Sequence, residues 1–502
     1  MGGEASPLPK SPAGEAVAEA IEELGFGLYQ MVPLLLTGGI YLAEGAEMLV
    51  MGSLTSLLHS HWDLSPAIKG GMVSVVFIGF AVGNFISGQI GDRFGRRISI
   101  MIAYTMLFLF GFATAMSHGP VMMITLRFFV GAGCGIGFPA GYSLMPEVSP
   151  VSWKCGLSTL MIGFMPLGEI IGALGVLAID PGLNNSAIGC SYEMYWPSKA
   201  LLQPERCAWK SLCELSAIPA FMFLILAAKY LDESPLWLAC HGRYEECEEV
   251  LQRMARLNGK HLDVEKLRAA FSQKPSGGGK AEEGYSLANA VNKMCEPSLR
   301  YVVLFMFFAH ITKDFSVFGL SYMLPQFFVF LEGMSAGWEL LTVASISMPG
   351  ILLTYLASRV QWISLVHWMS GAAGLCSLLA LGMFEEAPDA VAAPCAYIVK
   401  LLALSYFIFT VVYTAFAFPT DIRNTAVGLC TCAGRVGSIG APMLFEISKG
   451  MTGSFDFFIG FLAVLMGAIA VTAPCALPRE TANKADSLAE SAKDYGSTKS
   501  TA

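Results

Sequence analysis

Long apolar runs alternate with short polar connections along most of the chain. A run of about 20 apolar residues is the length that a helix needs to cross the hydrocarbon core of a bilayer. Twelve such runs are present, and they predict an all-α membrane protein with twelve transmembrane helices. The predicted crossings are 31–53, 70–90, 98–116, 121–145, 158–179, 210–230, 300–325, 340–357, 361–383, 393–418, 425–446 and 456–477.

The composition supports a membrane protein. Of the 502 residues, 54% are hydrophobic and only 14% are charged, whereas about 25% of the residues of a soluble protein are charged. Most of the 13 cysteines lie in apolar runs, where cysteine usually acts as a small apolar residue. No Cys-x-x-Cys pair is present, so the sequence predicts no metal site, and it indicates no cofactor.

Basic residues are concentrated in alternate connections, which places both termini in the cytosol by the positive-inside rule. The expected parts are a cytosolic lead (1–30), a first six-helix bundle (31–231), a cytosolic central loop (232–298), a second six-helix bundle (299–478) and a cytosolic tail (479–502). In the central loop, the alternating charges of 232–260 predict a surface helix.

A short motif occurs once in each half of the chain. Glu147-x-x-Pro150-x-x-x-Lys154 follows the fourth crossing, and Phe416-x-x-Pro419-x-x-x-Arg423 follows the tenth. A repeat of six crossings is typical of transporters built from two bundles, whose binding site lies between the bundles near the middle of the membrane.

The connection between the second and third crossings combines one acid with three arginines. It reads Gly88-Gln-Ile-Gly-Asp92-Arg93-Phe-Gly95-Arg96-Arg97. Arginines alone would serve as a membrane anchor, but an anchor needs neither the aspartate nor two glycines at fixed offsets. The motif resembles the signature between helices 2 and 3 of the major facilitator transporters. The resemblance implies a cytosolic gate that is closed in the outward-facing state and is formed by Gly88, Asp92, Arg93, Gly95, Arg96, Arg97, Glu147, Lys154 and Arg423.

Further motifs resemble synaptic-vesicle-2-related proteins and organic-ion transporters, over nearly the whole chain. They are Gly25-Phe-Gly-Leu-Tyr-Gln30, Ala43-Glu44-Gly-Ala-Glu47, Glu233-Ser-Pro235-Leu-Trp237 and Gly434-Arg435-Val-Gly437. Three positions depart from the family pattern: Ser358 and Phe416 stand where acids are expected, and Leu236 stands where an arginine is expected. The missing acids predict a gate that is stronger in the first half.

Charged residues interrupt several predicted crossings of the first half, among them Glu44, Glu47, Arg127 and Glu169. Charges at membrane depth are costly and usually functional, so these residues are candidates for substrate binding or proton coupling. Glu44 is the preferred coupling residue, because Glu47 is expected near the outer surface, where water would stabilise its charge. A structural ion pair between the fourth and fifth crossings is the alternative for Arg127 and Glu169.

The second half carries Lys313, Asp314 and Arg435 within its crossings. Adjacent helical residues point about 100° apart, so one of Lys313 and Asp314 is expected to face the site while the other pairs sideways. The basic residues would suit an anionic substrate, whereas Glu44 and Glu47 would suit a cation. The sequence leaves the sign of the substrate open.

The loop 180–208 is predicted to lie outside the cell or in a lumen. It contains the glycosylation sequon Asn184-Asn-Ser186. Cys190 and Cys207 lie in the same loop and could form a disulfide in an oxidising compartment.

The function that fits these features is secondary active transport of a small organic ion or polar metabolite by alternating access, coupled to protons. The alternatives are a non-transporting membrane sensor or vesicle binding protein, and a facilitative uniporter for sugar-like solutes. No motif indicates a membrane enzyme or a nucleic-acid partner. We expect a monomer in the plasma membrane or an intracellular vesicle membrane, with a small-molecule substrate, protons and the lipid bilayer as its partners.

Overall fold

The computed structural model describes residues 12–62, 64–183, 208–272, 292–297, 299–331, 334–357, 362–418 and 423–476. Within these ranges the secondary structure is helical. Ten of the described helices are long and apolar enough to cross a membrane, and a shorter apolar helix covers Ala336–Leu352. The predicted all-α membrane fold is therefore confirmed.

The long helices follow the predicted crossings. They are α2 (Leu28–Trp62), α3 (Pro66–Phe94), α4 (Arg96–Thr114), α5 (Pro120–Glu147), α6 (Lys154–Ile162) with α7 (Phe164–Ile179), α8 (Ala208–Tyr230), α13 (Arg300–Phe330), α14 (Ala336–Ala357), α15 (Trp362–Ala380), α16 (Asp389–Ala417), α17 (Arg423–Thr452) and α18 (Asp456–Ala476). The predicted fifth crossing is interrupted at Gly163, between α6 and α7. Pro166 lacks an N–H for the carbonyl of Ile162, so the regular hydrogen-bond ladder cannot continue there.

The chain divides into two compact units. Unit 1 comprises Met1–Glu283 with Ser321–Ser345, and unit 2 comprises Gly284–Leu320 with Ile346–Ala502. Helices α13 and α14 therefore each contribute residues to both units.

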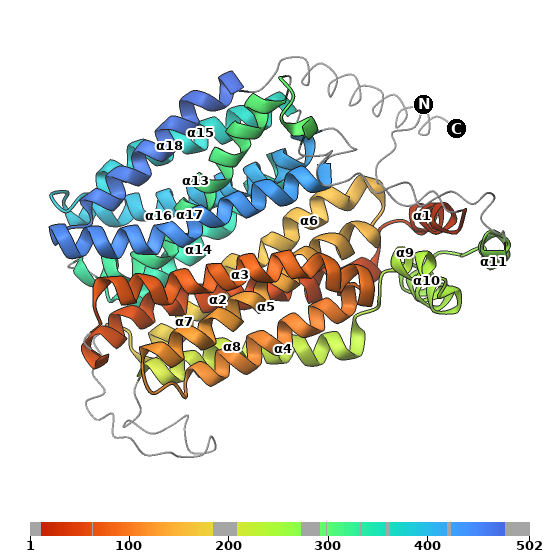
Figure 1. Cartoon of the computed structure of the whole chain (residues 1–502), viewed down its shortest axis with the longest axis horizontal. Helices are drawn as coiled ribbons and strands as arrows, with labels where there is room; N and C mark the ends of the chain where they lie inside the picture. The colour runs from red at the N-terminus through yellow and green to blue at the C-terminus, as the bar shows by residue number, and fades with distance from the viewer. Residues whose placement is uncertain are drawn as a thin grey trace. The chain divides into compact units, whose positions relative to one another are not determined.

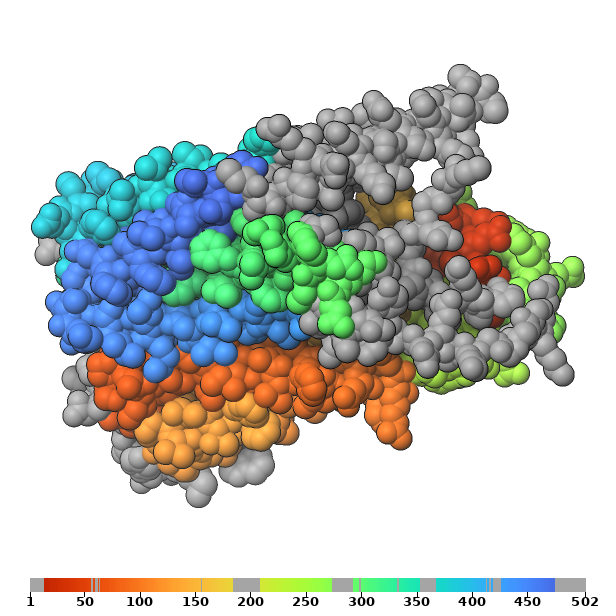
Figure 2. Space-filling model, turned by 45° about the horizontal axis from the view of Figure 1, so that its top comes forward, coloured from red at the N-terminus to blue at the C-terminus, as the bar shows by residue number. Residues whose placement is uncertain are grey.

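In unit 1, helices α3 and α5 pack with their main chains in close approach. A methyl group placed on Gly79 would lie 2.0 Å from the carbonyl oxygen of Phe128, and one on Gly131 would lie 1.8 Å from that of Val76. Small residues allow this kind of approach between membrane helices. The glycine-rich run that begins at Gly131 thus serves helix packing. The side of α3 that faces away from α5 is visible on the surface of the molecule (Figure 2, orange).

Four short helices lie together at one end of the long helices of unit 1 (Figure 1). They are α1 (Pro12–Leu24), α9 (Pro235–Cys240), α10 (Tyr244–Asn258) and α11 (Val264–Ser272). The surface helix predicted over 232–260 is present as two helices, because Gly242 has a φ of 71° and separates α9 from α10. Helix α1 was not predicted; its signal is the helical spacing of Val17, Ile21 and Leu24, which are all buried.

Asn258, at the end of α10, forms hydrogen bonds with the turn between α1 and α2. Its side-chain oxygen accepts a hydrogen bond from the main-chain N–H of Tyr29 at 3.0 Å. Its amide nitrogen donates to the carbonyl oxygen of Gly25 and to the side-chain oxygen of Gln30, both at 3.1 Å. Gln30 is fully buried and also donates to the carbonyl oxygen of Val148. The start of α2 is thus bonded to segments that are distant in the sequence.

In unit 2, α15 packs against α16 and α18. The hydroxyl groups of Ser370 and Ser377 donate to the carbonyl oxygens of Ala470 and Ala463, both at 2.7 Å. Hydroxyl groups satisfied in this way hold membrane helices together without leaving a polar group exposed to hydrocarbon.

Several predicted features lie outside the described residues. They are the sequon at Asn184, the cysteines Cys190 and Cys207, the segment with Ser358, and the side chains of Phe416 and Arg423.

The glycine contacts of α3 generate a prediction. Gly79→Ala should lower the free energy of unfolding by about 1–3 kcal/mol, because the added methyl group must push α3 away from α5. Gly71→Ala in the same helix is the matched control, because nothing lies within 4 Å of its new methyl group. Thermal unfolding of the purified variants measures both effects, and an equal change in the two would contradict the packing argument.

Candidate functional site: a charged clasp and two buried ion clusters

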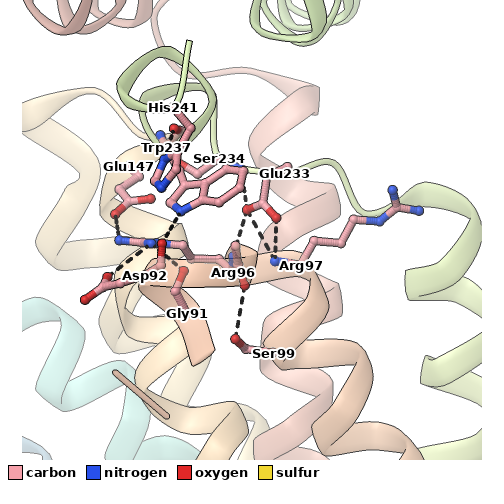
Figure 3. A network of polar contacts seen from close by, with 11 residues as sticks. Gly91, Asp92, Arg96, Arg97, Ser99, Glu147, Glu233, Ser234, Trp237 and His241 are labelled. Carbon is pink, nitrogen blue, oxygen red and sulfur yellow. Dashed lines mark hydrogen bonds and ion pairs between the residues drawn. The ribbon is translucent and has the colours of Figure 1, made fainter. Parts of the chain in front are cut away.

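Arg96 is the centre of a charged clasp at the junction of α3 and α4. Its guanidinium donates to the carbonyl oxygen of Gly91 at 2.7 Å and to a carboxylate oxygen of Glu147 at 3.2 Å. The carboxylate of Asp92 lies 3.4 Å from the same guanidinium. Figure 3 shows these groups converging on Arg96 from α3 and α5. The clasp therefore joins three elements that are separated in the sequence.

Glu233 completes the clasp from the segment that follows α8. Its carboxylate accepts hydrogen bonds from the main-chain N–H groups of Arg96, at 2.8 Å, and Arg97, at 3.2 Å. These N–H groups are unsatisfied at the start of α4, where the helix dipole also favours an anion. Gly95 has a φ of 99°, and a methyl group there would lie 2.1 Å from the Glu233 carboxylate. Glycine thus gives both the required backbone conformation and the required space.

The Glu233 side chain is partly buried. Burial raises the pKa of its carboxyl group, and the hydrogen bonds from the main chain act in the opposite direction. Beside it, the indole of Trp237 donates to the carbonyl oxygen of Asp92 at 3.0 Å. The same indole stacks on the ring of His241, with 4.1 Å between the ring centres. Helix α9 is thereby fixed against the end of α3.

The structure brings together only part of the predicted gate. Arg96, Asp92 and Glu147 meet as expected, but the Asp92 side chain is 81% exposed. The Arg93 guanidinium lies over the ring of Phe94. Lys154 forms no ion pair within the described part of the chain, and around Gly88 the structure leaves open space. The prediction did not place Glu233 in the gate, although its motif had been recognised in the sequence.

A second charged cluster is buried within unit 1, among α2, α5 and α8. The Arg127 guanidinium forms an ion pair with the carboxylate of Glu47. The Ser216 hydroxyl donates to Glu47 at 2.7 Å, and the Cys213 sulfur accepts from Arg127 at 3.6 Å. Arg127 is fully buried and Glu47 is 6% exposed. The expectation that water solvates Glu47 is therefore wrong: the long α2 carries this position into the packed interior.

Glu44 lies beside this pair but is not the partner of Arg127. Glu44, Glu47 and Arg127 all line a cavity of about 10 Å³, which is close to the smallest volume that holds one water molecule. Glu169 lies elsewhere in unit 1, where its carboxylate accepts a hydrogen bond from Ser321 at 3.1 Å. The alternative of an ion pair between Arg127 and Glu169 is not observed.

The third charged cluster is buried in unit 2. Lys313 and Asp314 form an ion pair with each other, and the Arg435 guanidinium lies 3.9 Å from the second carboxylate oxygen of Asp314. Adjacent residues were expected to diverge, but the long lysine side chain bends back to its neighbour and lies 4.3 Å from the ring centre of Phe407. His310, one turn earlier in α13, contacts the Thr414 hydroxyl at 2.7 Å. The sequence analysis did not identify His310, although a histidine one turn from a lysine–aspartate pair was a usable signal.

Known proteins share this arrangement of helices and motifs. The sugar (and other) transporter family matches residues 55–483. The chain belongs to this family of major facilitator transporters.

Two relatives illustrate the range of the family. The synaptic vesicle 2-related protein of Xenopus laevis is 25% identical over 93% of this chain and 81% of its own length. The organic cation/carnitine transporter 7 of Arabidopsis thaliana is 23% identical over 93% of this chain and 95% of its own length. The resemblance inferred from the motifs is therefore confirmed.

A solved structure supports the fold. The partially occluded, inward-open xylose transporter XylE of E. coli superposes with a TM-score of 0.66 at 17% identity, over 90% of this chain and 98% of XylE. The twelve-helix fold is therefore shown, and the family match with the long apolar helices makes this chain a multi-pass membrane protein of a transporter family. Arg96 and Glu233 lie in the motifs that carried the resemblance.

The clasp generates a prediction. Glu233→Ala should lower the free energy of unfolding by about 1–2 kcal/mol, because it leaves the first N–H groups of α4 without their anion. Asp92→Ala should cost less than about 1 kcal/mol, because its carboxylate is largely solvated. Thermal unfolding measures the order of the two effects, and a larger loss in Asp92→Ala would contradict the assignment of Glu233.

Proposed function

We propose that the protein is a secondary active transporter that moves a small organic ion or polar metabolite by alternating access and is coupled to protons through Glu47. In this proposal both termini are cytosolic, and the clasp around Arg96 is the cytosolic gate. The protein acts as a monomer in the plasma membrane or an intracellular vesicle membrane.

The observation that carries the proposal is the buried ion pair of Glu47 and Arg127. Removing one partner of such a pair leaves an uncompensated charge and typically costs about 3–5 kcal/mol. Protonation of Glu47 has the same effect on the charge balance, because it leaves the Arg127 charge without its counter-charge. The protonated and ionised forms therefore favour different arrangements of α2, α5 and α8, and a proton can drive a conformational change.

The cavity beside the pair supports a route for the proton. A single water molecule in a space of about 10 Å³ would lie next to both Glu44 and Glu47. Glu44 then passes the proton to Glu47 and is not itself the partner of the arginine. This role reverses the order of importance that the sequence suggested for the two acids.

The charge of the unit 2 cluster favours a substrate that carries a carboxylate. The relatives' names point to different solutes, organic cations and carnitine for the plant protein and xylose for XylE. In unit 2, two buried cations, Lys313 and Arg435, lie beside the carboxylate of Asp314. A substrate carboxylate would form charge-assisted hydrogen bonds with these two cations.

The proposed coupling predicts a specific loss. Glu47→Gln should abolish accumulation against a gradient when the outside is acidified, because the pair no longer responds to protons. It should preserve exchange of substrate at equal pH. Glu44→Gln should reduce accumulation by a smaller factor. Uptake and counterflow in proteoliposomes measure these activities.

The same experiment separates the alternatives. A coupling free energy of 1–3 kcal/mol corresponds to a roughly 5–150-fold effect, so a loss of accumulation of at least about tenfold in Glu47→Gln counts as abolition. If the wild type never concentrates any substrate under a pH gradient, the facilitative uniporter replaces the proposal. Normal concentrating uptake by Glu47→Gln would rule out coupling through this residue.

The proposed substrate class predicts a second result. In an uptake screen that pairs small carboxylates with quaternary ammonium compounds of similar size, carboxylates should be taken up. Arg435→Gln should raise KM for the best of them by about tenfold or more, because it loses a charge-assisted hydrogen bond. Lys449→Gln, near the end of the same helix, is the control. Uptake of the ammonium compounds alone would contradict the carboxylate assignment.

A further inference from the structure

Helix α8 of unit 1 carries an exposed apolar stripe that ends in a lysine. Ile218, Phe221 and Ile225 are 44%, 43% and 53% exposed, and Lys229 follows at the same helical spacing and is exposed. Residues three or four apart lie on one face of a helix. In a membrane protein such a face contacts lipid tails, so Lys229 lies where the hydrocarbon gives way to headgroups.

Helix α4 brings a second cation to the same place. The Arg97 guanidinium donates to the carbonyl oxygen of Ala228 at 2.8 Å, one residue before Lys229. Figure 3 shows this guanidinium pointing away from the other labelled side chains of the clasp. Arg97 reaches Glu233 only through its main-chain N–H. Its charge is therefore presented at the end of α8 and is not used by the clasp.

The nearby acids are engaged elsewhere. Glu233 accepts from the main chain at the start of α4. Asp232 lies within electrostatic range of Arg97, but its carboxylate forms an ion pair with Arg253 and accepts from the Tyr29 hydroxyl. In the described residues neither Arg97 nor Lys229 has a carboxylate at ion-pair distance. Arg97 and Lys229 thus bring two positive charges to the end of α8, and no described carboxylate forms an ion pair with either.

We propose that Arg97 and Lys229 bind the phosphate of an anionic phospholipid at the end of α4 and α8. The phosphate oxygens accept hydrogen bonds from the guanidinium and the ammonium group, and the acyl chains lie along the apolar stripe of α8. Tyr230 is 49% exposed, and its ring lies 5.0 Å from the Lys229 nitrogen, in the position that aromatic residues take at a membrane interface.

The apolar stripe favours a lipid over a free phosphate ion. A phosphate ion would interact only with the two cations. A lipid would interact with the cations and would also cover the exposed side chains of Phe221 and Ile225. Each basic residue near a membrane surface contributes about fivefold to the binding of anionic lipid. Loss of either Arg97 or Lys229 should therefore weaken binding by about that factor.

The opposite end of α8 offers a matched control. Lys210 lies on the same helical stripe, with its nitrogen 5.5 Å from the ring of Trp209. Among the described residues, no arginine is bonded beside Lys210 as Arg97 is beside Lys229, and Glu214 lies one turn away. It therefore tests whether any lysine at the end of this stripe retains anionic lipid, or whether the pair with Arg97 is required.

The experiment uses the full-length protein, purified in detergent and supplied with equal amounts of phosphatidylglycerol and phosphatidylcholine. Native mass spectrometry counts the bound lipids. The wild type should retain phosphatidylglycerol in preference, and Lys229→Gln and Arg97→Gln should each lower that preference about fivefold. Lys210→Gln should keep it, and millimolar inorganic phosphate should not displace the lipid. Thermal unfolding of each variant verifies that it is folded.

Three results would overturn the proposal. The first is equal retention of the two lipids by the wild type, which removes the preference for a negative headgroup. The second is an equal loss in Lys210→Gln and Lys229→Gln, which shows a diffuse effect of net charge. The third is displacement by inorganic phosphate, which makes the site an anion site without a lipid.

Discussion

The need to pair every charge that leaves water governs this structure. An ion in a medium of low dielectric loses several kcal/mol of hydration, which only close partners restore. Arg127 is fully buried and is paired with Glu47 and Cys213, and Ser216 in turn donates to Glu47. Asp92 is mostly exposed and has a single longer contact with Arg96. The same residue types therefore hold the protein together at one site and contribute little at another.

This constraint also explains which features the sequence predicts well. The crossings follow from hydropathy, because a bilayer accepts helices whose side chains are apolar over a fixed length. The glycine run at Gly131 predicts close packing, because only glycine permits main chains to approach so nearly. The sequence analysis missed the break between α9 and α10, where Gly242 adopts a positive φ and interrupts the helix.

The pairing of embedded charges was harder to predict. Glu44 and Glu47 lie on one helix face, and sequence alone does not tell which of them meets α5. Position along the helix favoured Glu44 as the coupling residue. In the structure Glu47 is the partner of Arg127, and Ser216 on α8 also donates to it. In unit 2 the flexible side chain of Lys313 turns back to Asp314. Side-chain conformation, which helical geometry does not determine, decides the partner there.

The hydrogen bonds of Asn258 have a consequence for biosynthesis. The turn that begins α2 is completed by a side chain 229 positions later in the chain, and Gln30 of the same turn is bonded to Val148, 118 positions later. A ribosome makes the chain from its N-terminus, so the first membrane helix is inserted long before these partners exist. Its end stays incompletely bonded until the central segment is translated. The turn before α2 can therefore form all of its hydrogen bonds only after α10 has been translated. At that point the second half of the protein has still to be made.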